Sequence, residues 1–138
     1  VWMFICYFIY KHESVVEELK AIPQVQDNES EESDIALKIM ALFENDKVYL
    51  NPNLRLSDIA SLVGTNRTYV SRFFNNECKV SFFDFVNGYR VNLAKSILKE
   101  SSDKIDSIAE KTGFNSRQSF YRVFTKIVGM PPEKYRAL

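Results

Sequence analysis

From residue 34 onward, apolar residues recur mostly three or four positions apart, which is the spacing of amphipathic α-helices. The first such segment, 34–46, has Ser33 or Asp34 as its expected N-cap. A longer segment, 81–101, begins at Ser81, which is also a good capping residue. Its apolar positions fall on one stripe: Phe82, Phe85, Val86, Tyr89, Leu93, Ile97 and Leu98. The pattern predicts an all-α fold in which 81–101 is a rigid connecting helix.

A unit of about 50 residues occurs twice on either side of this long helix. The first copy reads LSDIASLVGTNRTYVSRFF (56–74) and the second reads IDSIAEKTGFNSRQSFYRVF (105–124). In each copy an Ile-Ala pair is followed, four residues after the Ala, by a glycine, and later by an Arg-x-Phe triplet. The glycines are Gly64 and Gly113, and the second turn is one residue longer. Two copies in register are a stronger indication than either copy alone.

Each copy has the pattern of a helix, a tight turn and a second helix. Gly64 and Gly113 supply the positive φ that ends the first helix of each pair. Polar residues stand where the helices are expected to begin: Ser57, Thr65 or Asn66, and Asn115 or Ser116. A helix pair with a glycine-containing turn is the helix-turn-helix arrangement, whose second helix enters a DNA major groove.

The second helix of each pair divides into an apolar and a polar face. The residues expected to face the core are Val70, Phe73 and Phe74 in the first copy, and Phe120, Val123, Phe124 and Ile127 in the second. The residues left on the outer face are Arg67, Thr68, Ser71 and Arg72, and then Arg117, Gln118, Tyr121 and Arg122. The outer faces carry arginine, amide and hydroxyl groups, which are the groups that contact DNA.

The formal net charge is zero, but the charges are unevenly distributed. Residues 1–47 contain four Lys or Arg against ten Asp or Glu, whereas residues 48–138 contain fourteen against eight. The basic half is the half that contains both repeats. Such asymmetry suggests that this half meets a polyanion, although a basic segment is also compatible with an ordinary solvated surface.

The residues of 105–124 read I-x-x-I-A-x-x-x-G-F-x-x-x-x-x-F-x-R-x-F, and GMPPEKYR follows at 129–136. Together with the repeat, they resemble the AraC/XylS family of transcription regulators over residues 34–138. The resemblance implies about seven helices in two helix-turn-helix subdomains joined by the long central helix. It also implies two recognition helices in successive major grooves of double-stranded DNA, about one helical turn apart.

The resemblance starts the recognition helices near Asn66 and Ser116 and places base contacts on the two outer faces defined above. Arg can be bidentate to guanine and Gln to adenine, although the same arginines can instead bind phosphate or pair with an acid. Lys79 stands where the family usually has glycine, which leaves the shape of that turn open. Thr68 and Ser71 are small, so the first helix is expected to contribute less sequence information than the second.

The chain opens VWMFICYFIY, ten residues without a charge, and Lys11 follows. A membrane span needs about 20 apolar residues, so we interpret 1–12 as the truncated end of a transmembrane helix. A buried helix and a signal-peptide remnant are the alternatives. Residues 13–33 are predicted to be an acidic linker, with 34–138 as the DNA-binding domain. This arrangement predicts a regulator tethered to the inner face of the bacterial cytoplasmic membrane.

The predicted function is that of a DNA-binding transcription regulator, and the resemblance favours activation, with RNA polymerase as a further candidate partner. A protein-interaction module that has lost DNA binding is the alternative. A third hypothesis is that residues 13–33 cover the basic face until a signal releases it. Catalysis is not indicated, because His12 is the only histidine and no nucleophile–base pair or metal-ligand cluster occurs. No metal or cofactor is expected.

Overall fold

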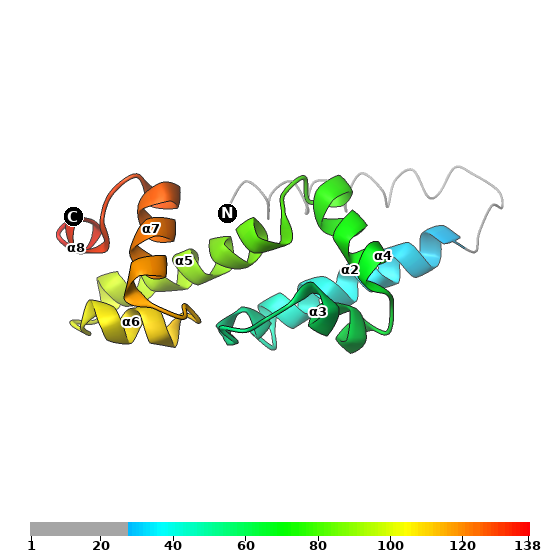
Figure 1. Cartoon of the computed structure of the whole chain (residues 1–138), viewed down its shortest axis with the longest axis horizontal. Coiled ribbons are helices and arrows are strands. Elements are labelled where there is room, and N and C mark those ends of the chain that lie inside the picture. Colours follow the sequence, from blue (N-terminus) through cyan, green and yellow to red (C-terminus); the bar gives the residue numbers. More distant parts are fainter. Residues whose placement is uncertain (1–27) are drawn as a thin grey trace.

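The computed structural model describes residues 28–138, and this part of the chain is helical throughout, with no β-strand (Figure 1). The elements are α2 (Asn28–Glu44), the 3₁₀ turn η1 (Val48–Leu50), α3 (Leu56–Val63), α4 (Arg67–Arg72), the π-helical turn η2 (Phe73–Glu77), α5 (Phe82–Glu100), α6 (Ile105–Lys111), α7 (Arg117–Val128) and α8 (Pro132–Arg136). The prediction of an all-α fold with about seven helices is confirmed.

The long helix α5 joins two groups of shorter helices (Figure 1). One group, α2 to α4, lies at the amino-terminal end of α5, and the other, α6 to α8, lies at its carboxy-terminal end. Ser81 caps α5 as predicted, because its hydroxyl oxygen accepts the amide N–H of Asp84 at 3.1 Å. The architecture is therefore two helix-turn-helix units on one connecting helix.

Each unit has a hydrophobic core of its own. The first core cluster is centred on Phe43, whose ring contacts those of Tyr49, Phe74, Phe85 and Tyr89. The second core cluster contains the fully buried residues Phe120 and Phe124 of α7, packed against Ile108 and Leu98. The buried α5 residues of the first cluster end at Val86 and those of the second begin at Val91, while the half-buried Tyr89 and Leu93 still pack against the first cluster. The two cores therefore adjoin along the central helix and use different faces of it.

The helix α2 begins at Asn28, six residues before the predicted start at Asp34, so the prediction for this end was wrong. Residues 28–33, which we assigned to the acidic linker, are helical, and Ser33 lies inside the helix rather than capping it. Acidic residues such as Glu31 and Glu32 interact favourably with the positive end of a helix dipole, which favours helix here as well as a solvated loop. The rest of the predicted linker, 13–27, lies outside the described residues.

Three smaller predictions also need correction. Ser57 does not cap α3: the N-cap is Arg55, whose amide N–H donates to a carboxylate oxygen of Asp58 at 2.8 Å. Ile127 is 47% exposed, and it is the neighbouring Val128 that packs against the second core cluster. On α5 the buried set includes Val91 and Ala94 outside the predicted stripe, since the two units pack on different faces of that helix.

Lys79 occupies the turn before α5 with φ of 58°, which is the left-handed conformation that favours glycine. The turn therefore has the backbone conformation that a glycine would adopt. A Cβ in this conformation costs about 1–2 kcal/mol, whereas glycine loses about 0.5–1 kcal/mol more chain entropy on folding. We expect Lys79→Gly to raise the free energy of unfolding by about 0.5–1 kcal/mol in urea denaturation. Lys79→Ala keeps the Cβ and should give no such gain; an equal gain in both variants would refute the conformational explanation.

Candidate nucleic-acid interface

The turns of both units position the helix that follows them. Gly64 (φ 75°) ends α3 and Gly113 (φ 88°) lies between α6 and α7, as predicted. Asn66 caps α4, with its side-chain oxygen accepting an amide N–H three residues on at 2.8 Å. Ser116 caps α7 in the same way at 3.1 Å. Asn66 and Ser116 therefore fix where the two candidate recognition helices start, whether or not they also touch DNA.

On the first unit, the predicted outer residues gather on one open surface. Arg67, Thr68 and Arg72 are exposed and Ser71 is half-buried. These four side chains line a shallow hollow together with Asn75 and Asn76, and no acidic residue lines it. Neither arginine forms a hydrogen bond or ion pair with another residue of the described part of the chain. The hollow therefore presents two uncommitted guanidinium groups among neutral polar side chains.

Asn75 and Asn76 were missed by the sequence prediction, which ended the recognition helix at its apolar residues. They belong to η2, where the amide N–H of Cys78 reaches the carbonyl of Phe73, five residues back, at 3.1 Å. This π-helical turn prolongs α4, and the side-chain amide of Asn75 donates to the hydroxyl of Ser71 at 3.3 Å. The spacing of four residues from Ser71 to Asn75, and from Arg72 to Asn76, is the signal that could have found them.

On the second unit, two of the predicted outer residues have no partner among the described residues, and the other two interact with side chains of their own unit. Gln118 and Arg122 are exposed and have no hydrogen bond or ion pair among the described residues. Arg117 pairs with Asp106 at 3.2 Å, donates to the hydroxyl of Tyr121 at 3.2 Å, and lies 5.1 Å from the centre of that ring. The Arg117 and Asp106 side chains are both more than half exposed, so their pairing is worth at most about 1 kcal/mol and leaves the arginine available to another partner.

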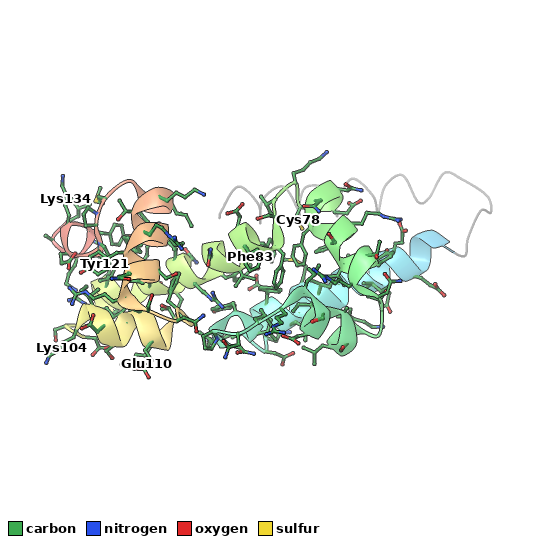
Figure 2. All side chains as sticks on the ribbon, viewed as in Figure 1. Cys78, Phe83, Lys104, Glu110, Tyr121 and Lys134 are labelled. Atoms are coloured by element: carbon green, nitrogen blue, oxygen red, sulfur yellow. The ribbon has the colours of Figure 1, made fainter. Side chains whose placement is uncertain are left out.

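Tyr121 is half-buried rather than fully outward (Figure 2). Its ring packs against the second core cluster, and its hydroxyl donates to the Glu133 carboxylate of α8. Tyr121 therefore links α7 to α8 and holds Arg117 from one side. Of the four outer residues of α7, it is the one most clearly engaged in the structure of its own unit.

Tyr69 of α4 is half-buried and interacts with Glu32 in the amino-terminal part of α2. Partial burial raises the pKa of its phenol, and the carboxylate of Glu32, which accepts a hydrogen bond from it, raises that pKa further. The acidic start of α2 therefore contacts α4. Whether residues 13–27 cover the outer face of α4 stays a prediction, because they lie outside the described part of the chain.

None of the helices between residues 28 and 138 combines the length and the apolar character needed to cross a membrane. The predicted end of a transmembrane helix, residues 1–12, lies outside this range. Within residues 28–138, no three His, Cys, Asp or Glu side chains are placed so that they could hold a metal ion.

Two helix-turn-helix units on one connecting helix, each with exposed polar and basic groups on its second helix, define a tandem helix-turn-helix domain. The family model described as "Helix-turn-helix domain" matches residues 59–138, more than half of the chain. The chain belongs to this family, in its AraC-type form, and the resemblance read from the repeat is confirmed.

Known relatives agree with this assignment. Residues of the chain are 39% identical over 83 positions to an uncharacterized HTH-type transcriptional regulator, YtdP, of Bacillus subtilis (strain 168). The match covers 60% of this chain but 11% of that relative, so the chain spans about a tenth of its length.

Two solved structures have the same fold. The C-terminal domain of AraT, a response regulator from Geobacillus stearothermophilus, is similar with a TM-score of 0.69 and 25% identity, over 75% of this chain and 84% of that one. The DNA-binding domain of AdpA, a global transcriptional factor solved with a target DNA, gives a TM-score of 0.68 at 21% identity, over 75% of this chain and 91% of that one.

Proposed function

We propose that this chain is the DNA-binding part of a bacterial transcription regulator and recognises a specific double-stranded sequence by placing α4 and α7 in successive major grooves. The observation that carries the proposal is the pair of exposed polar faces, Arg67 to Arg72 and Arg117 to Arg122, on equivalent helices of two repeated units. The family to which the chain belongs supports the same reading.

The two outer faces are suited to different kinds of contact with DNA. On α7, Arg117, Gln118 and Arg122 carry the long side chains that can form bidentate contacts with base edges. On α4, two arginines flank the small residues Thr68 and Ser71, and the hollow between them fits a phosphate group or one base edge. We therefore assign most of the sequence information to α7.

The experiment that tests the proposal is selection from a randomised duplex pool by the full chain, followed by sequencing, at two salt concentrations. A bipartite motif with centres about 10 base pairs apart is the expected result. Affinity for the selected duplex, measured by fluorescence anisotropy, should fall steeply with salt, because bound phosphates release counterions. Binding without an enriched motif would mean phosphate contacts alone. No binding at either salt would support the protein-interaction module.

The proposal extends to how the regulator is used. Activation through contact with RNA polymerase rests on the family resemblance. Tethering to the membrane rests on the ten uncharged residues before Lys11. Co-sedimentation of residues 1–138 and of residues 28–138 with lipid vesicles tests whether this apolar run has membrane affinity: ten residues are too few to span a bilayer, but the longer chain should bind more of the vesicles, and equal binding would refute the assignment.

A further inference from the structure

The two units meet directly at a buried arginine of the central helix. Arg90 lies between Val86, the last buried α5 residue of the first core cluster, and Val91, the first of the second, and it is 9% exposed. Its Nε donates to the carbonyl of Tyr49 at 2.7 Å, and its Nη2 donates to the carbonyl of Asn51 at 2.8 Å. These two hydrogen bonds attach a charged side chain of α5 to the backbone of the loop that precedes α3.

The same loop is in contact with the turn of the second unit. The side-chain amide of Asn115 donates to the carbonyl of Pro52 at 3.1 Å. A Cβ built on Gly113 would lie 2.5 Å from the carbonyl oxygen of Tyr49, which shows how closely the two backbones approach. On this side the Arg90 guanidinium also lies 5.7 Å from the centre of the Phe114 ring. The contacts of Asn115 and Gly113 with residues 49–52 run from one unit to the other without passing through α5.

These contacts involve segments that lead directly into the helices on which the recognition helices depend for their position. Residues 113–115 end immediately before Ser116, the N-cap of α7, and residues 49–52 lead into α3, which packs on α4. A shift of either segment therefore moves a recognition helix. Along the axis of duplex DNA, one base pair corresponds to about 3.4 Å, so reading two sites at one spacing requires that such shifts stay small.

We propose that the inter-unit junction, formed by Arg90, Gly113 and Asn115 with the carbonyls of residues 49–52, sets the spacing and rotational phase of the two half-sites that the chain accepts. This inference rests on the proposed function. Its physical basis is preorganisation: a second recognition helix that is already held in place loses little freedom on binding. When the junction is loosened, each recognition helix stays intact, but the chain can also bind half-sites at neighbouring spacings.

The test uses the full chain and a set of duplexes in which the two selected half-sites are moved apart or together in steps of one base pair. Further duplexes carry one half-site with the other scrambled. Asn115→Ala removes one junction contact from an exposed side chain. Asn92→Ala, at an exposed position of α5 with no hydrogen bond among the described residues, is the matched control. Thermal melts followed by circular dichroism establish that both variants are folded at the assay temperature.

For the unaltered chain and for Asn92→Ala, we expect affinity to peak sharply at one spacing. For Asn115→Ala, the preference for that spacing over its neighbours should fall about two- to fivefold, the size expected for one hydrogen bond, with single half-site affinity unchanged. An unaltered spacing profile, or an equal loss at every spacing and on single half-sites, would overturn the junction proposal and leave the proposed function standing. Failure of the unaltered chain to bind any duplex would overturn both.

Discussion

Replacing Arg117 and Arg122 together by alanine is expected to weaken binding to the selected duplex by between about 30-fold and 10⁴-fold. Each bidentate contact of an arginine with a guanine is worth about 1–3 kcal/mol, and the two positions are both exposed and lie about 1.4 turns apart on α7. Fluorescence anisotropy with the selected duplex, compared with a duplex carrying scrambled half-sites, measures the loss of both affinity and specificity.

Two controls separate base reading from a general loss of positive charge. Arg117→Lys with Arg122→Lys keeps the charge but loses the bidentate geometry, so we expect it to retain non-specific binding and lose sequence preference. Lys104→Ala with Lys134→Ala removes two charges from exposed positions outside the recognition helices (Figure 2) and should weaken binding by less than about tenfold. If the arginine pair behaved like this lysine pair, α7 would not be reading bases.

Gly113→Ala is expected to lower the free energy of unfolding by about 2–4 kcal/mol. A residue with a Cβ at φ of 88° already costs about 1–2 kcal/mol, and here the Cβ also meets the Tyr49 carbonyl at 2.5 Å. Because the obstacle is backbone held by Arg90, it cannot move aside as a flexible side chain would. Urea denaturation followed by circular dichroism measures the change.

Gly129→Ala is the matched control for this prediction. Gly129 has a similar φ of 85°, but a Cβ there would meet no atom within 4 Å. The free energy of unfolding of Gly129→Ala should therefore fall only by the cost of placing a Cβ at positive φ, about 1–2 kcal/mol. An equal loss in the two variants would show that the first unit moves away from Gly113 at little cost, and that the close approach of the two units does not contribute to stability.

The parts of the fold that could be predicted are those set by local sequence. The repeated Ile-Ala and glycine positions gave both helix-turn-helix units, and the caps at Asn66, Ser81 and Ser116 lie where short polar side chains precede apolar runs. A cap and a positive φ depend on a few neighbouring residues. They can therefore be recognised without knowing what packs against them.

What could not be predicted depends on residues far apart in the sequence. Arg90 lies in an amphipathic helix and has the pattern of a solvated charge until the loop 49–52, about 40 residues away, is placed beside it. The start of α2 was missed because acidic residues are compatible with both a linker and the first turns of a helix. Asn75 and Asn76 were missed because α4 continues as a π-helical turn beyond the apolar residues Phe73 and Phe74, at which the prediction ended the helix.

The division of the core into two clusters along α5 has a consequence for cooperativity. Each half carries most of its own apolar contacts, so the two halves need not have equal folding stability. A duplex that engages both recognition helices binds only molecules in which both halves are folded, and it stabilises them together. On the proposed function, operator occupancy then depends on the folding stability of the weaker half. A buried substitution that destabilises either half would lower that occupancy, and so alter gene control, while much of the protein is still present.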